Sequence, residues 1–204
     1  MIAIVNYGLG NVQAIANIYA RLEIPARIVT TADELADATR VILPGVGAFD
    51  TAMARLDESG MRAVLDRLVV AEGRPALGIC VGMQMMADAS AEGVRAGLGW
   101  IPGEVRRMEA LAPLRPLPLP HMGWNDLVPS GPHPLLLELE TGARLYFLHS
   151  FYVVPRDGAD VIASTVYGAS FASVVCRGRI CGAQGHPEKS HKWGIQLLRN
   201  FAEL

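Results

Sequence analysis

The sequence predicts a three-layer α/β fold, in which a mostly parallel central sheet carries helices on both faces and continues into an antiparallel extension. Three observations support this prediction. Short apolar runs alternate with helical patterns in the first part of the chain. Glycine and proline then interrupt the chain after residue 98, as is typical of hairpins and loops. Strand-like runs separated by turn residues follow closer to the C-terminal end.

The first part contains four predicted strands, each followed by helical sequence. The predicted strands are residues 2–6, 26–30, 41–43 and 75–80. The predicted helices are residues 12–22, a short helix through residue 38, a pair from residue 48 to residue 70 with a break near Gly60, and residues 81–89. Either Thr31 or Asp33 could cap the short helix. Strands that alternate with helices in this way usually pair in parallel.

The second part is predicted to be rich in β-structure. Residues 98–134 contain many glycines, prolines and short runs, including leucine alternating with proline over residues 111–120, and we expect short hairpins and loops there. Residues 120–125, PHMGWN, match neither a helix nor a half-buried strand. Further strands are expected at residues 144–150, 161–167, 171–176 and 179–183, and an amphipathic helix at residues 192–202. We expect one domain over residues 1–204.

Composition indicates a globular protein with a sizeable core. The chain has 204 residues, of which 51% are hydrophobic and 19% charged. A net charge of −2 without a basic run argues against a nucleic-acid partner. Glycine and proline break the apolar stretches before membrane-spanning length, and the first residues lack the pattern of a signal peptide. We therefore expect a cytoplasmic protein with no membrane partner.

The three cysteines are Cys80, Cys176 and Cys181. A small odd number without framework spacing favours a reducing compartment. We expect Cys176 and Cys181 to be buried as small apolar side chains. No CxxC or HxxxH spacing occurs, so the sequence predicts no metal site.

Cys80 lies where the fourth strand is predicted to turn into a helix. Residues 78–82 read Gly-Ile-Cys-Val-Gly, the pattern of a nucleophile elbow with cysteine in place of serine. Such a turn strains the corner residue and crowds the residues two positions to either side, which favours glycine there. A helix N-terminus also favours a thiolate. The alternative is a buried cysteine at a strand end, with glycines that serve only a turn.

A candidate base for Cys80 lies near the C-terminal end, in residues 183–190, AQGHPEKS. Pro187 disfavours helix at His186, and in an extended chain His186 and Glu188 would point to the same side. Glu188 could then orient the imidazole, and His186 could take the proton from Cys80. The alternative is a His-Pro-Glu turn at the surface.

Together, GICVGMQ and GHPEKS resemble the class I (triad) glutamine amidotransferases. That family hydrolyses glutamine with a Cys-His-Glu triad, passes the ammonia to a synthase partner, and has a flavodoxin-like fold. The resemblance covers essentially the whole chain, through NYGLGN, PGVGAF, GICVGMQ, PHMGWN, YFLHSFY and GHPEKS in that order. NYGLGN and PHMGWN are similar to one branch in particular, the glutaminase subunit of imidazole glycerol phosphate synthase in histidine biosynthesis.

The resemblance implies roles for further residues. The loop after the third strand would supply one oxyanion donor from the backbone of Val46 or Gly47, and Val81 would supply the other. The implied contacts to the glutamine substrate are Gln84, Glu92, His149, Ser150 and Phe151. The alternatives are a solvated loop carboxylate at Glu92 and a structural histidine at His149.

The resemblance also implies a partner, a (β/α)₈-barrel cyclase that forms a heterodimer with this chain and receives the ammonia. No cofactor is implied. The implied interface residues are Asn11, Pro120, His121, Met122, Gly123, Trp124, Asn125 and Lys189. For Lys189 a solvated surface lysine is the alternative.

One residue departs from the family pattern. Gly185 stands where the family usually has a large aromatic residue before the catalytic histidine. An unfilled cavity there would cost roughly 3–5 kcal/mol, so we expect either compensating packing elsewhere or a looser strand at His186. Two other functions stay open: a different Cys-elbow hydrolase or deglycase of similar fold, and a non-catalytic scaffold subunit.

Overall fold

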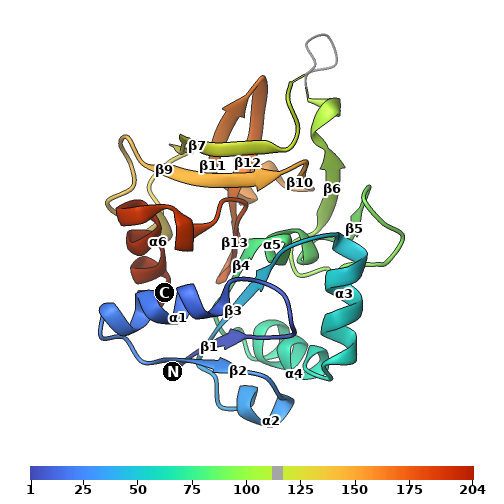
Figure 1. Ribbon diagram of the computed structural model, residues 1–204, viewed down its shortest axis with the longest axis vertical. Helices are drawn as coiled ribbons and strands as arrows, with labels where there is room; N and C mark the ends of the chain where they lie inside the picture. Colours follow the sequence, from blue (N-terminus) through green and yellow to red (C-terminus); the bar gives the residue numbers. More distant parts are fainter. Residues whose placement is uncertain (112–116) are drawn as a thin grey trace.

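The computed structural model describes residues 1–111 and 117–204, so part of the leucine–proline stretch predicted as hairpin or loop lies outside the described residues. An eight-stranded sheet crosses the protein in the order β2-β1-β3-β4-β13-β12-β11-β8 (Figure 1). Its parallel strands are β1 (Ile2–Val5), β2 (Ala26–Val29), β3 (Arg40–Gly45), β4 (Ala76–Cys80) and β13 (Ile180–Ala183). Its antiparallel strands are β12 (Ala169–Arg177), β11 (Val161–Tyr167) and β8 (Val128–Pro129). The predicted parallel sheet with an antiparallel extension is confirmed.

Helices cover the parallel strands. On one side α1 (Val12–Arg21) packs against the last helix, α6 (His191–Glu203). Elsewhere α3 (Phe49–Glu58) packs against α5 (Val81–Met85), and α2 (Ala32–Leu35) against α4 (Arg62–Asp66), which runs into the π-helical turn η1 (Arg67–Ala71). The chain moves to the edge of the sheet through α1 and returns through α2 and α3. Right-handed crossovers therefore put α1 on the opposite face from α2 and α3. No helix among the described residues is long and apolar enough to cross a membrane.

Two helix predictions are refined by the structure. Thr31, and not Asp33, caps α2, because its side chain accepts a hydrogen bond from the backbone N–H of Glu34. The helix after Cys80 is shorter than predicted and ends at Met85. A later segment of the chain supplies hydrogen bonds to the carbonyl groups at this helix end. The N–H of Leu98 donates to the carbonyl oxygen of Met85, and that of Ile101 donates to the carbonyl oxygen of Met86.

Two smaller sheets lie beyond the parallel strands. One contains β10 (Phe151–Pro155), β6 (Gly103–Arg107) and β5 (Ala89–Ser90), and the other pairs β7 (His121–Asp126) with β9 (Arg144–His149). Short 3₁₀ turns complete the chain at η2 (Met108–Ala110), η3 (Pro134–Leu136), η4 (Gly158–Asp160) and η5 (Pro187–Lys189).

The motif PHMGWN was wrongly predicted to match no strand, because residues 121–126 form β7. Its polarity is inverted relative to an ordinary half-buried strand. The side chain of His121 is buried, whereas Met122 and Trp124 are 62% and 54% exposed. An inward polar residue between outward apolar ones hides the strand from a search based on apolar alternation.

The two late cysteines are buried, as predicted, but they are not separate apolar side chains. Cys176 on β12 and Cys181 on β13 lie directly opposite each other in the antiparallel register, and they form a disulfide. The tight turn between these strands brings the two residues together although the spacing resembles no disulfide framework. Cysteine usage therefore no longer supports a reducing compartment. Cys80 is the free cysteine of the chain.

The junction of β3, β4 and α5 has no room for side chains at its glycines. A Cβ added at Gly82 would lie 1.8 Å from the backbone oxygen of Leu43, and one at Gly78 would lie 2.7 Å from the backbone of Met83. Helix α5 therefore crosses β3 and β4 at a distance that only glycine permits.

We predict that Gly82→Ala lowers the free energy of unfolding by about 1–3 kcal/mol, because the added methyl group must push α5 away from β3. Urea unfolding followed by circular dichroism measures this. Gly131→Ala is the matched control, since a Cβ there meets no atom within 4 Å. Equal stabilities for the two variants would show that α5 is not held by this contact.

Candidate functional site

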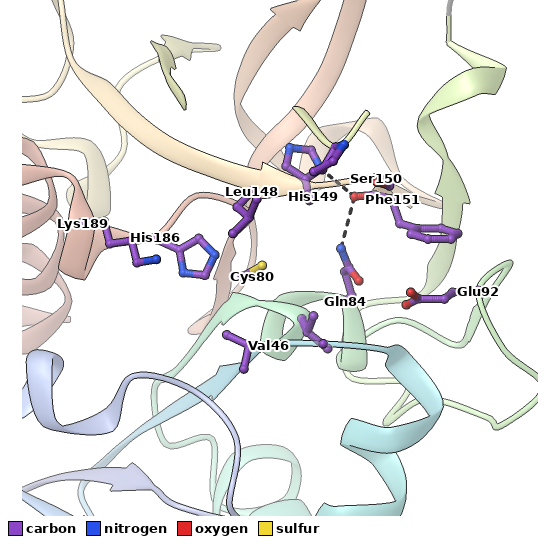
Figure 2. Close-up of a pocket in the computed structure, with 13 residues that line it drawn as sticks. Val46, Cys80, Gln84, Glu92, Leu148, His149, Ser150, Phe151, His186 and Lys189 are labelled. Atoms are coloured by element: carbon purple, nitrogen blue, oxygen red, sulfur yellow. Dashed lines mark hydrogen bonds between the residues drawn. The ribbon is translucent and has the colours of Figure 1, made fainter. Parts of the chain in front are cut away.

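A pocket of about 310 Å³ lies at the carboxyl ends of the parallel strands, where ligands bind in open α/β sheets (Figure 2). Segments far apart in the sequence line it: the loop after β3, the start of α5, the junction of β9 and β10, and the turn after β13. Its lining residues are Val46, Gly47, Cys80, Val81, Gln84, Glu92, Pro120, Leu148, His149, Ser150, Phe151, His186 and Lys189.

Cys80 occupies the strained corner that the elbow pattern predicts. It ends β4 and precedes α5, with φ of 54° and ψ of −113°. A non-glycine residue adopts positive φ rarely, and such strain is common where a side chain is held for chemistry. The thiol is buried apart from its access to the pocket.

His186 and Glu188 lie beside Cys80 and contact each other. The Nδ1–H of His186 donates to Oε1 of Glu188 over 3.0 Å, and both side chains are nearly fully buried. The predicted extended backbone holds at His186, with φ of −100° and ψ of 97°, but Glu188 lies in the 3₁₀ turn η5. The turn, and not a continuous extended chain, brings the carboxylate back to the imidazole.

The surroundings of His186 favour its protonated form. Burial by itself lowers the pKa of the imidazole, but hydrogen bonds with Cys80 and Glu188 and the charges of both groups outweigh it and raise the pKa to about 10. An imidazole held between a cysteine sulfur and a carboxylate is the arrangement expected of an activated cysteine.

In the segment predicted to hold an oxyanion donor, Pro44 and Gly45 end β3, and the loop that begins at Val46 borders the pocket. Gly47 has φ of +85°, and the side chain of Val46 is 38% exposed. The strand end that leads into the loop is held by Tyr7, just after β1, because its buried hydroxyl donates to the carbonyl oxygen of Pro44 over 2.7 Å. Burial and the nearby Cys80 both raise the pKa of Tyr7, so the hydroxyl stays protonated.

Gln84 faces the pocket from α5, one turn after Cys80 (Figure 2). Its Nε2 donates to the carbonyl oxygen of Phe151 over 3.2 Å and to Oε1 of Gln184 over 3.1 Å. Gln184 is a residue that sequence reasoning missed. It is a buried polar side chain two positions before His186, and this alternation could have indicated a shared side of the strand.

Glu92 and His149 line the pocket, but both also have partners within the protein. Oε2 of Glu92 accepts a hydrogen bond from the N–H of Phe49 over 2.9 Å, at the start of α3. Nδ1 of His149 donates to the carbonyl oxygen of Phe151 over 2.8 Å. These contacts correspond to structural roles, the alternative that the sequence left open for His149.

His149 continues into a second buried histidine. Because its Nδ1–H is donated to a carbonyl group, its Nε2 accepts from Nδ1–H of His121 over 3.1 Å. Nε2 of His121 accepts in turn from Asn125 over 3.3 Å, and Asn125 also donates to the carbonyl oxygen of Val166. Burial lowers the pKa of His121 to about 4 and that of His149 to about 3, so both rings are neutral at pH 7.

The remaining predicted interface residues lie on two sides of the pocket. The outward face of β7 and β9 presents four side chains in cross-strand register: Met122, Trp124, Tyr146 and Leu148. The Nζ of Lys189 lies 5.5 Å from the ring centre of Tyr146. Pro120 borders the pocket and Gly123 lies within β7, whereas Asn11 is exposed at the start of α1.

The cavity considered at Gly185 is absent. A Cβ there would lie 2.7 Å from Cβ of Leu145 on β9 and 3.2 Å from the carbonyl oxygen of Tyr146. The N–H of His186 donates to that same Tyr146 carbonyl over 2.8 Å. The structure shows compensating packing, one of the possibilities raised by the sequence. Strand β9 lies too close to Gly185 for an aromatic side chain, and its Tyr146 carbonyl holds the backbone of His186.

Comparison with known proteins identifies the family of this chain. Residues 3–204 match the family model described as glutamine amidotransferase class-I. The chain belongs to the class-I glutamine amidotransferase family. It is 55% identical to an imidazole glycerol phosphate synthase subunit HisH from Bdellovibrio bacteriovorus and 47% identical to one from Leptospira interrogans, over the full length of both chains in each case.

Solved structures show the same fold at lower identity. A crystal structure described as a glutamine amidotransferase superimposes with a TM-score of 0.75 at 22% identity, covering 99% of this chain and 97% of the other. PurLQS from Thermotoga maritima superimposes with a TM-score of 0.72 at 19% identity, covering 99% and 97%. At this identity the likeness establishes the fold alone, which is that of class-I glutamine amidotransferases.

We predict that the buried histidine pair makes the protein acid-sensitive. The folded-state pKa values of about 4 and 3 lie below the ordinary value near 6.5, so protons bind the unfolded chain more strongly. The neutral histidines therefore contribute their full stabilisation to the folded protein above about pH 6.5. The free energy of unfolding decreases as the pH falls toward 4, by about 1–2 kcal/mol per histidine at pH 5.

Urea unfolding at pH 7 and pH 5 measures this loss. His121→Phe, which keeps a ring between Phe147 and Tyr167, should reduce the difference between the two pH values. His191→Asn removes an exposed histidine and is the control. The same pH difference in all three proteins would contradict the prediction.

Proposed function

We propose that this chain is the glutaminase subunit of an imidazole glycerol phosphate synthase, hydrolysing glutamine to glutamate and ammonia. The observation that carries the proposal is the convergence of two distant segments. The strained Cys80 and the imidazole of His186 line one pocket, and the carboxylate of Glu188 holds that imidazole. The relatives at 55% and 47% identity, which are named as HisH subunits, support the choice of synthase.

In the proposed reaction the Cys80 thiolate attacks the side-chain amide of glutamine. Backbone N–H groups of Val81 and of Val46 or Gly47 stabilise the tetrahedral oxyanion. Protonated His186 gives its proton to the leaving ammonia, and a glutamyl thioester remains on Cys80. Water then attacks the thioester with His186 as the base, and glutamate leaves. Glu188 holds the imidazole with its other nitrogen toward the sulfur.

The substrate would occupy the part of the pocket between Gln84 and the β9–β10 junction. Gln84 would contact the substrate directly, and Ser150 and Phe151 would do so through their backbone. Glu92 would contact the α-amino group of the substrate, while its Oε2 also holds the N–H of Phe49. The proposed contribution of His149 passes through the Phe151 carbonyl, because its Nδ1–H donates there.

A cyclase subunit with a (β/α)₈ barrel is the proposed partner, forming a heterodimer that receives the ammonia. It would convert the ammonia and a phosphoribulosyl-formimino aminoimidazole carboxamide ribonucleotide into imidazole glycerol phosphate and an aminoimidazole carboxamide ribotide. The exposed apolar face of Met122, Trp124 and Leu148 next to the pocket supports docking there, because such patches often mark protein interfaces. Lys189 and Asn11 would lie at its edges.

We predict that glutamate release is slow in the isolated chain and rises at least tenfold with the cyclase and its nucleotide, because an uncoupled glutaminase would waste glutamine. Coupled detection of glutamate measures the turnover. Cys80→Ala should abolish it while leaving stability close to that of the unchanged protein. Glutamine-dependent synthesis that survives Cys80→Ala would favour a scaffold subunit, and activity only on other substrates would favour a different hydrolase.

We further propose that the partner completes the oxyanion hole by moving the loop after β3. Gly47 holds φ of +85°, which proline cannot adopt, and a Cβ at this residue would meet no atom within 4 Å. Gly47→Pro should therefore lower partner-stimulated turnover at least tenfold with little effect on the core. Thermal unfolding verifies the fold of the variant, and full stimulated turnover would refute the role of the loop.

A further inference from the structure

Gln184 is a fully buried amide between the predicted nucleophile and the substrate-facing Gln84. Its Nε2 donates to Sγ of Cys80 over 3.7 Å, and its Oε1 accepts from Nε2 of Gln84 over 3.1 Å. Its backbone N–H donates to the carbonyl oxygen of Ser173 over 2.8 Å, which ties it to β12. A polar side chain without exposure is stable only when its donors and acceptors are matched.

The donors and acceptors along this chain alternate, which selects one orientation for each amide. The carbonyl oxygen of Phe151 can only accept, so it requires the NH₂ group of Gln84. The second hydrogen of that NH₂ group requires an oxygen, which places Oε1 of Gln184 toward Gln84. The NH₂ group of Gln184 is then left to face the sulfur of Cys80.

This arrangement has a consequence for the pocket. Both hydrogens of the Gln84 amide are used inside the protein, by Phe151 and Gln184. Gln84 therefore presents its carbonyl oxygen to the substrate, as an acceptor for an N–H group. If the Gln184 oxygen were lost, one hydrogen of this NH₂ group would lose its partner, and the Phe151 carbonyl alone would hold the Gln84 amide.

We infer that Gln184 is a positioning residue of this site, which holds the Gln84 amide together with the Phe151 carbonyl and donates a hydrogen bond to the sulfur of Cys80. The inference rests on the proposed function for its substrate, although its effect on the thiol can be measured without glutamine. A donor to sulfur stabilises the thiolate over the thiol, and so favours the nucleophilic form.

Gln184→Met tests both contacts, since methionine has a similar shape and cannot donate. The rate of Cys80 alkylation by iodoacetamide, followed by mass spectrometry across pH 5–10 in the chain alone, reports the thiol. We expect the apparent thiol pKa to rise and alkylation at pH 7 to slow roughly fivefold, because the loss of one hydrogen bond typically changes an equilibrium constant by about that factor. With cyclase and nucleotide, the KM for glutamine should also rise.

Gln184→Glu separates the two contacts and serves if the methionine variant does not fold. Burial raises the pKa of this carboxyl, so the comparison is made at a pH high enough to ionise it. The ionised glutamate still accepts from Gln84 but cannot donate to sulfur, so the KM should stay nearer that of the unchanged protein while the thiol pKa rises further. Asn200→Leu is the control, because it removes a buried amide that holds the carbonyls of Leu135 and Leu137, outside the pocket lining.

Unchanged alkylation profiles and unchanged KM in the Gln184 variants would overturn the inference, as would changes no larger than those of Asn200→Leu at equal loss of stability. The proposed function fails separately. In that case the unchanged protein with its partner releases no glutamate, while the alkylation profiles still differ between Gln184 and its variants.

Discussion

The close crossing of α5 over β3 and β4 is the constraint on which the site depends. It forces Cys80 to positive φ, because the strand must turn into the helix within one residue. The crossing is possible only because Gly78 and Gly82 bring no side chain into the contact. The packing of the whole sheet thus stabilises a strained residue, and the strain directs the thiol into the pocket.

Around this corner, polar groups are buried in connected pairs. His186 is held by Glu188, Gln84 by Gln184, and His149 by His121. Each pair joins segments that are distant in the sequence or turn back on themselves. In a site with little exposure an unmatched donor or acceptor is costly, so these networks leave few alternative orientations. This explains how short loops can hold chemically important groups in a defined arrangement.

The same networks connect the pocket to the surface that we propose for the partner. Strand β7 exposes Met122 and Trp124 on one side, while its buried His121 on the other side contacts His149, which in turn holds the Phe151 carbonyl. Tyr7, just after β1, similarly donates to the Pro44 carbonyl at the end of β3, next to the loop that borders the pocket. A partner that shifts β7 or the β1–α1 loop would therefore act directly on groups that border the substrate pocket.

The sequence by itself determined the parallel sheet, its antiparallel extension and the elbow at Cys80, because these features follow from local periodicity and from glycine spacing. It also indicated His186 with Glu188, since proline restricts the chain beside them.

Only the tertiary structure decided the rest. The strand at residues 121–126 was hidden by its inverted polarity, the pairing of Cys176 with Cys181 depends on strand register, and Gln184 matters only because it meets Cys80 and Gln84. Leu145 likewise fills the space at Gly185 from another strand. Contacts between distant segments depend on how strands are paired and packed, and no local pattern of residues specifies that.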